Sequence, residues 1–303
     1  MTAFALLLVL LAAVLHAFWN YCAKRSAGGL PFVFAVGCVI CTCYVPVLAV
    51  YFTSRPLDLS LTAPLWIFGS GVLKTSYTLF LQRSYRHGDF SLVYPVARGT
   101  GPLLSTFAAV LLLGERPSLL AIAGGLVIVL SIFWLTGGFA HFSATFFNRT
   151  AAPTPPTGPV RSAAATSISY GITSGLFIAA YTIWDRHGVA ALAIAPVVYD
   201  AGTAFTQLAL LSPFAARRWP EVRNEWRTKK RWIFGVALLS PVAYILVLTA
   251  MTFTPVSYVA PAREISIVIG AFIGAKFLNE TDSRRRLLAA LFMAAGVIAL
   301  ALG

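Results

Sequence analysis

Residues 94–115 read YPVARGTGPLLSTFAAVLLLGE, and residues 259–280 read VAPAREISIVIGAFIGAKFLNE. When the second stretch is aligned with the first at an offset of 165 residues, both charged residues of the first stretch match charged residues of the second without a gap. The identical pairs include Ala97 with Ala262, Arg98 with Arg263, Phe107 with Phe272 and Glu115 with Glu280. Hydrophobicity alone does not produce such a register, so the sequence predicts two copies of one structural unit.

The composition places both copies in a membrane. Hydrophobic residues make up 58% of the chain, charged residues make up only 11%, and the mean hydropathy is +0.80. Several runs reach the roughly 20 apolar residues that cross a hydrocarbon core of about 30 Å. The sequence therefore predicts an all-α, polytopic membrane protein with ten transmembrane helices. The predicted spans are residues 4–22, 32–52, 64–83, 90–113, 119–135, 167–184, 189–211, 232–253, 257–278 and 287–302.

These spans divide into five and five at a loop rich in Pro, Thr and Gly. The first five-helix unit is expected at residues 1–138, the loop at 139–162 and the second unit at 163–303. Because each unit has an odd number of spans, the second unit must cross the membrane in the opposite sense to the first. This 5+5 inverted-topology repeat is the plan of secondary transporters that work by alternating access.

The net charge of +13 comes mainly from loops at the membrane surface. Seventeen of the 23 Lys and Arg residues fall on the side reached after odd-numbered spans, and three fall on the other side. This distribution indicates contact with a lipid bilayer and not with nucleic acid. By the positive-inside rule, both termini should face outward and the basic loop between spans seven and eight should face the cytoplasm. The expected location is the cell (inner) membrane.

Further stretches carry a resemblance to a known family. Each copy continues from its helix through a short turn holding a Glu into a last helix rich in small residues, AIAGGLVIVL and AALFMAAGVI, and the chain opens with LHAFWNYCAKR. Over nearly the whole chain, these features resemble the EamA-type repeat of the drug/metabolite transporter superfamily. The resemblance implies a permease whose central pathway is lined by spans one, three, four, six, eight and nine. Members of that superfamily move amino acids, sugar phosphates, nucleotide sugars and quaternary amines.

Five charged side chains are expected inside spans: Lys74, Arg98, Asp200, Arg263 and Glu264. Each needs a partner or a wet cavity, because a charge at mid-bilayer costs at least about 2.5–3.5 kcal/mol. Arg98 and Arg263 are expected roughly 10 Å below opposite membrane surfaces. They are therefore predicted to be cationic anchors for an anionic group, at the two ends of one central site. Structural ion pairs that clamp helices are the alternative, and this is the interpretation favoured for Asp200, because span seven is not on the pathway.

Polar and aromatic side chains complete the expected site. The candidate substrate-binding residues, besides Lys74, Arg98 and Arg263, are Trp19, Asn20, Tyr77, Tyr94, Tyr181 and Tyr244. Glu264 and His16 are the candidate proton carriers, since carboxylates and histidines are the groups that carry protons in membrane transporters.

Three classes of function compete. The first is a secondary transporter of a small anionic or zwitterionic metabolite, amino-acid-like or organophosphorus. This class agrees with the excess of positive charge expected inside the spans, where there are three cations and two carboxylates. An exporter of cationic drugs or quaternary amines from the same superfamily is the alternative. A membrane-embedded enzyme would need a clustered nucleophile and base or several metal ligands, and four scattered histidines do not supply them. No cofactor or metal is expected, and the protein is expected to be a monomer or a homodimer.

Overall fold

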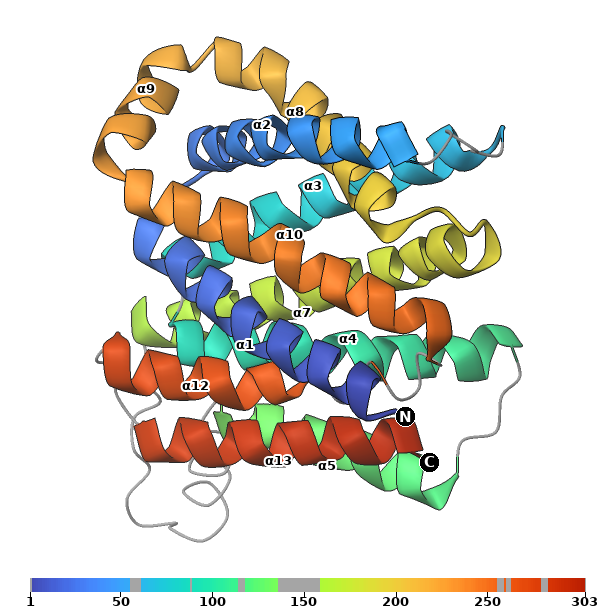
Figure 1. Cartoon of the computed structure of the whole chain (residues 1–303). Helices are drawn as coiled ribbons and strands as arrows, with labels where there is room; N and C mark the ends of the chain where they lie inside the picture. Colours follow the sequence, from blue (N-terminus) through green and yellow to red (C-terminus); the bar gives the residue numbers. More distant parts are fainter. Residues whose placement is uncertain are drawn as a thin grey trace, which may run out of the picture.

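The computed structural model describes residues 2–54, 61–87, 89–113, 118–135, 159–254, 259, 263–278 and 283–302. Within these residues the chain forms eleven α-helices and one short π-helical turn, packed as a bundle (Figure 1). The first five helices are α1 (Ala3–Ser26), α2 (Leu30–Ser54), α3 (Ala63–His87), α4 (Phe90–Leu113) and α5 (Leu119–Leu135). The others are α7 (Pro159–Arg186), α8 (Pro196–Ala216), α9 (Trp219–Thr228), α10 (Lys230–Phe253), α12 (Ile265–Phe277) and α13 (Ser283–Leu302). The all-α prediction is confirmed for the described residues.

Three of the described helices, α1, α2 and α10, are long and apolar enough to cross a membrane by length and composition. Shorter apolar helical segments occur at Leu119–Ile132 in α5 and at Ile265–Phe277, which is α12. The number of ten spans stays a prediction.

The structure differs from the predicted spans at the starts of spans six and seven. Span six is predicted from residue 167, whereas α7 begins at Pro159. Span seven is predicted from residue 189, whereas the chain forms the π-helical turn His187–Ala191 there and α8 begins at Pro196. Proline lacks a backbone N–H and has a fixed φ, so it starts a helix more readily than it continues one. Of the predicted span nine, residues 257–278, the structure describes residues 259 and 263–278. Within them α12 begins at Ile265, and Arg263 and Glu264 directly precede this helix.

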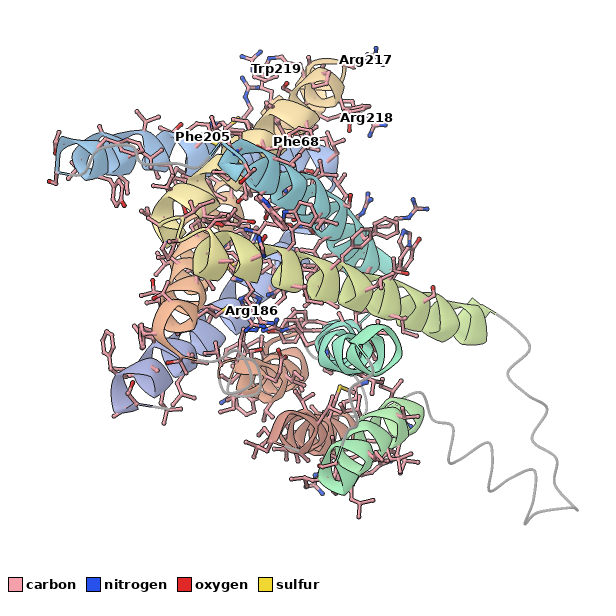
Figure 2. The ribbon with its side chains drawn as sticks, turned by 90° about the vertical axis from the view of Figure 1, so that its right-hand side faces the viewer. Phe68, Arg186, Phe205, Arg217, Arg218 and Trp219 are labelled. Atoms are coloured by element: carbon pink, nitrogen blue, oxygen red, sulfur yellow. The ribbon has the colours of Figure 1, made fainter. Side chains whose placement is uncertain are left out.

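The predicted basic loop between spans seven and eight contains α9, which the sequence prediction missed. Glu221 in the first turn of α9 and Arg227 in its last turn suit the helix dipole. Figure 2 shows Arg217, Arg218 and Trp219 projecting from the junction of α8 and α9. α9 has only ten residues and is rich in charged side chains, so its sequence resembles a surface loop.

Helices from the two halves pack against each other throughout the bundle. α1 packs along α10 and α3 along α7, while α4 packs against α7 and α1 against α12. The pairs α2 with α8, α4 with α12 and α5 with α13 are also in contact. Exchanging α1 with α7, α2 with α8, α3 with α10, α4 with α12 and α5 with α13 converts this set of pairs into itself. Both termini lie at one end of the bundle, and α9 lies at the other (Figure 1).

Charged residues gather at the end of the bundle that holds α9. The Lys24 ammonium donates to the Tyr85 carbonyl oxygen at 2.9 Å, which ties the end of α1 to the end of α3. A hollow of about 350 Å³ lies beside these helix ends and α9. Its charged lining residues are Arg83, Arg86, Arg218, Glu221 and Glu225. This grouping agrees with the one-sided distribution of basic residues in the sequence.

α5 and α13 approach closely where Gly124 faces Gly296. A Cβ at Gly124 would overlap the Leu300 backbone nitrogen and lie 2.6 Å from the Gly296 carbonyl oxygen. We expect Gly124→Ala to lower the midpoint of thermal unfolding, because backbone atoms cannot rotate away and overpacking costs about 1–3 kcal/mol. Gly125→Ala is the matched control, since it gains the same helix propensity while its Cβ would lie 3.4 Å from Leu103. Equal midpoints for the two variants would contradict this close approach.

Candidate functional site

A cavity of about 130 Å³ lies between helices of the two halves. α1, α2 and α3 contribute one part of its wall, and α7, α8 and α10 contribute the other. Its polar and aromatic lining includes His16, Trp19, Lys74, Tyr77, Gln82, Tyr181, Asp200, Thr203, Gln207, Ser240 and Tyr244. No described lining residue comes from α4 or α12, although spans four and nine are expected to line the pathway.

Six of the predicted site residues meet at this cavity: His16, Trp19, Lys74, Tyr77, Tyr181 and Tyr244. The rings of the three tyrosines form a continuous wall. The centroids of Tyr77 and Tyr181 are 5.4 Å apart, and those of Tyr181 and Tyr244 are 6.3 Å apart. The structure therefore brings together residues from four separate helices, and their role in binding stays a prediction.

Asn20 and Tyr94, two further candidates, are not among the lining residues. Asn20 donates from its side chain to the His16 carbonyl oxygen at 2.7 Å and accepts a hydrogen bond from the Tyr85 hydroxyl at 2.7 Å. The Tyr94 ring stacks on Phe90, with the ring centroids 5.0 Å apart. The hydrogen bond from Tyr85 joins α1 to α3, and the binding roles of Asn20 and Tyr94 stay predictions.

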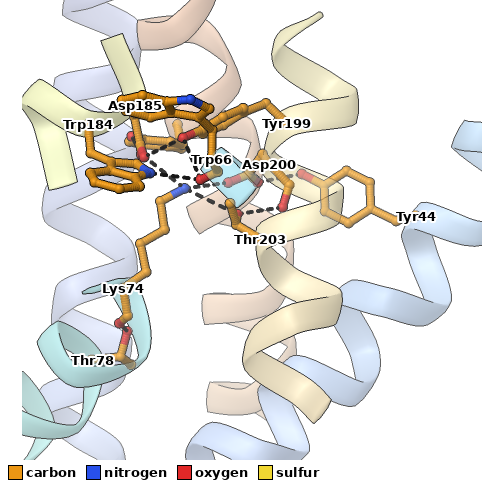
Figure 3. Close-up of polar contacts among 10 residues, drawn as sticks. Tyr44, Trp66, Lys74, Thr78, Trp184, Asp185, Tyr199, Asp200 and Thr203 are labelled. Carbon is orange, nitrogen blue, oxygen red and sulfur yellow. Dashed lines mark hydrogen bonds and ion pairs between the residues drawn. The ribbon is translucent and has the colours of Figure 1, made fainter. Parts of the chain in front are cut away.

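Lys74 reaches two carboxylates at one wall of the cavity (Figure 3). Its Nζ atom lies 3.2 Å from Asp200 Oδ1 and 3.4 Å from Asp185 Oδ2, and it donates to Thr203 Oγ1 at 3.2 Å. The same ammonium lies 4.0 Å from the centre of the Tyr244 ring, within the range of a cation–π interaction. One ammonium is thus the counter-charge of two carboxylates.

Asp185 is the member of this group that the sequence analysis missed. Its side chain is 1% exposed, and it accepts hydrogen bonds from the hydroxyls of Tyr199, at 3.0 Å, and Tyr244. The predicted end of span six is residue 184, and the charged residues that follow resemble a loop, but α7 continues through Asp185. The available signal was Tyr181, which lies four positions earlier and therefore on the same face of the helix.

Asp200 has both a structural role and a place in the cavity wall. Its Oδ2 accepts a hydrogen bond from the Tyr44 hydroxyl at 2.5 Å, while its Oδ1 faces Lys74. These contacts agree with the structural role predicted for Asp200. The expectation that span seven lies away from the site is wrong for this cavity, because α8 supplies Asp200, Thr203 and Gln207 to its wall.

Arg98 and Arg263 meet at a single carboxylate. Arg98 Nε lies 3.5 Å from Glu264 Oε2, and Arg263 Nε lies 3.5 Å from Glu264 Oε1. Arg98 Nη2 also donates to Ser266 Oγ at 3.2 Å. The predicted separation of the two arginines at opposite ends of one site is therefore wrong in this structure, because both guanidinium groups reach the same Glu264 carboxylate. The contacts match the alternative, a structural clamp.

The comparison with protein families gives one match, found twice along the chain. The model of the EamA-like transporter family matches residues 3–137 and residues 165–302. The chain belongs to the EamA-like transporter family. It is therefore a member of the drug/metabolite transporter superfamily, a multi-pass membrane protein and a transporter, not an enzyme. The resemblance seen in the two repeats is confirmed.

One solved crystal structure is similar to this EamA-like transporter over 98% of both chains, with a TM-score of 0.59 and 16% sequence identity. At that identity, the similarity shows a shared fold alone. No curated protein matches the chain in sequence.

In this EamA-like transporter, several buried polar atoms around the cavity lack a hydrogen-bond partner among the described residues. They include both ring nitrogens of His16, Nε1 of Trp19 and Oε1 of Gln82. The three residues are 6%, 8% and 3% exposed, respectively. Since a buried polar group without a partner costs about 1–3 kcal/mol, this wall suits a polar ligand or water.

Proposed function

We propose that this EamA-like transporter moves a small zwitterionic or anionic metabolite, amino-acid-like or organophosphorus, across the cell (inner) membrane by alternating access. The observation that carries the proposal is a cavity with charges of both signs around it. Lys74 and Asp200 lie in one wall, and buried ring nitrogens of His16 and Trp19 without a partner among the described residues lie in another. A zwitterion finds a partner of opposite sign for each of its own charged groups at such a site.

The balance of buried charges supports a zwitterion over a purely anionic molecule. The sequence suggested three intramembrane cations against two carboxylates, and the burial of Asp185 adds a third carboxylate. The described ion pairs form two clusters. The cluster around Lys74 has one carboxylate more than it has cations, and the cluster around Glu264 has one guanidinium more than it has carboxylates. A molecule that carries one charge of each sign matches both surpluses.

The size of the cavity supports a small substrate. A water molecule needs about 10–15 Å³ of such volume, so a cavity of about 130 Å³ has room for about ten water-sized groups. An amino acid or a small organophosphorus compound fits this limit, whereas a nucleotide sugar exceeds it.

The helix packing supports the proposed two-unit architecture and alternating access. The seven pairs of packed helices named above are unchanged as a set when α1, α2, α3, α4 and α5 are exchanged with α7, α8, α10, α12 and α13, in agreement with a pseudo-two-fold relation between inverted units. His16 lines the cavity between the units, and the Glu264 carboxylate forms ion pairs with Arg98 and Arg263. His16 and Glu264 remain candidate proton carriers.

A second candidate function is the export of a cationic drug or a quaternary amine. It is favoured by the aromatic wall, since the Lys74 ammonium already lies 4.0 Å from the Tyr244 ring centre and aromatic faces attract organic cations. The two candidates differ in the charge that the ligand must carry.

A thermal-shift screen of the purified protein separates these candidates. We expect amino acids or phosphonates to raise the unfolding midpoint, because a ligand at 100 times its Kd stabilises the folded state by about 2.7 kcal/mol. Uptake of the stabilising compound by proteoliposomes then tests transport. Stabilisation by quaternary amines and not by zwitterions would overturn the first proposal in favour of the exporter.

A further inference from the structure

We infer that Asp200 binds a primary ammonium group of the transported molecule, at the edge of the cavity where the Lys74 ammonium now lies against it. The inference rests on the proposed transport of a small zwitterion and specifies which of its groups is recognised and by which residue.

Lys74 has two carboxylate partners, and only one of them is in the cavity wall. The Asp185 side chain is 1% exposed and accepts hydrogen bonds from the hydroxyls of Tyr199 and Tyr244. Asp200 is 12% exposed at its side chain and lines the cavity. If Lys74 keeps Asp185, the Asp200 Oδ1 atom becomes available to a ligand. Lys74 and its two partners carry a formal charge of −1 together, so one added cation balances the cluster.

The Lys74 ammonium itself indicates what this position accepts. Its hydrogen-bond and ion-pair partners are Asp185, Asp200 and Thr203, and two of these, Asp200 and Thr203, lie on α8 in the cavity wall. A primary ammonium has three N–H donors, which suit the oxygen atoms of such a site. A quaternary ammonium has no N–H donor. The site should therefore favour primary ammonium groups.

An independent observation points to the rest of the ligand. Trp19 and His16, on α1, line the same cavity with buried ring nitrogens that have no partner among the described residues. The indole N–H is a donor only, and a neutral imidazole has one N–H donor. This part of the wall suits the acidic group of the same molecule. A zwitterion would then extend from Asp200 on α8 toward α1.

Chemical rescue tests the ammonium site without knowledge of the natural substrate. Lys74→Ala removes the ammonium and its aliphatic stem and leaves both carboxylates. The purified variant is unfolded thermally in detergent at increasing concentrations of propylammonium chloride. Tetramethylammonium chloride and sodium chloride at matched ionic strength serve as comparisons. We expect a rise of the unfolding midpoint that saturates with propylammonium and exceeds the rise with either other salt. Equal responses to the three salts would overturn the inference.

Two double variants assign the effect to one carboxylate. Lys74→Ala/Asp185→Asn retains Asp200 and should keep the propylammonium response, whereas Lys74→Ala/Asp200→Asn should lose it. The reverse order would overturn the assignment to Asp200. The first double variant has one fewer buried charge and carries the test if the single variant fails to accumulate. Lys229→Ala removes an ammonium that lies 2.9 Å from Glu225 and is the matched control, with no propylammonium-specific response expected.

Uptake by wild-type proteoliposomes separates this inference from the transport proposal. Uptake of a zwitterion together with failed rescue would overturn the ammonium site and leave the transport proposal standing. Rescue as expected, with no uptake of amino acids or phosphonates, would overturn the transport proposal and support the ammonium site.

Discussion

Replacing Glu264 by alanine should destabilise the protein by about 3–5 kcal/mol, the usual effect of breaking a buried ion pair. The Glu264 side chain is 1% exposed, and its two oxygens face Arg98 and Arg263 at 3.5 Å each. The variant leaves two buried guanidinium groups that have lost their shared carboxylate, and like charges in a poorly solvated place repel each other. The midpoint of thermal unfolding in detergent and the amount of protein in the membrane fraction measure this effect.

Alanine at either arginine is the informative control. Arg98→Ala and Arg263→Ala should each destabilise the protein less than Glu264→Ala, because each leaves a pair of one cation and one anion. Substrate anchors would behave differently: all three variants would keep the wild-type unfolding midpoint and lose only ligand binding. Arg98→Lys adds a second criterion, since an ammonium keeps the charge but loses the planar fork of the guanidinium. If all three alanine variants unfolded at the wild-type midpoint, the interpretation of these residues as a structural clamp would be wrong.

Lys74→Met should also destabilise the protein by about 3–5 kcal/mol and should abolish transport. Lys74 is the ammonium that Asp185 and Asp200 share, at 3.4 and 3.2 Å. Without it, the carboxylates of Asp185 on α7 and Asp200 on α8 lose their counter-charge and repel each other. Methionine retains an unbranched apolar stem, so the loss of stability reports the charge and not a new cavity.

Removing one carboxylate should partly reverse this effect. Lys74→Met/Asp185→Asn should unfold at a higher temperature than Lys74→Met, because one uncompensated buried charge has been removed and residues in direct contact do not behave additively. Asn retains polar atoms that can pair with the Tyr199 and Tyr244 hydroxyls. A double variant less stable than Lys74→Met would contradict the account of charge balance in this cluster.

Helical periodicity explains which site residues the sequence predicted correctly. Tyr77 and Lys74 lie three positions apart on α3, and His16 and Trp19 lie three positions apart on α1, so each pair shares one face of its helix. Both pairs face the cavity. Asp185 escaped prediction because it lies near the end of α7, where a charged residue is equally typical of an exposed turn. Its burial depends on tyrosines from α8 and α10, which are not its neighbours in the sequence.

The sequence by itself determined the helical character, the two copies and the family, because hydropathy, periodicity and internal repetition are properties of consecutive residues and of their register. It also identified the intramembrane charges as exceptional, since their insertion cost follows from the residue type alone. Only the tertiary structure decided how these charges pair. Lys74 contacts Asp200 from 126 positions away, and Arg98 and Arg263 share Glu264 instead of lying apart. Such pairing depends on which helices pack together and where each helix begins, and distances of a few Å between residues on different helices are not encoded in any local pattern.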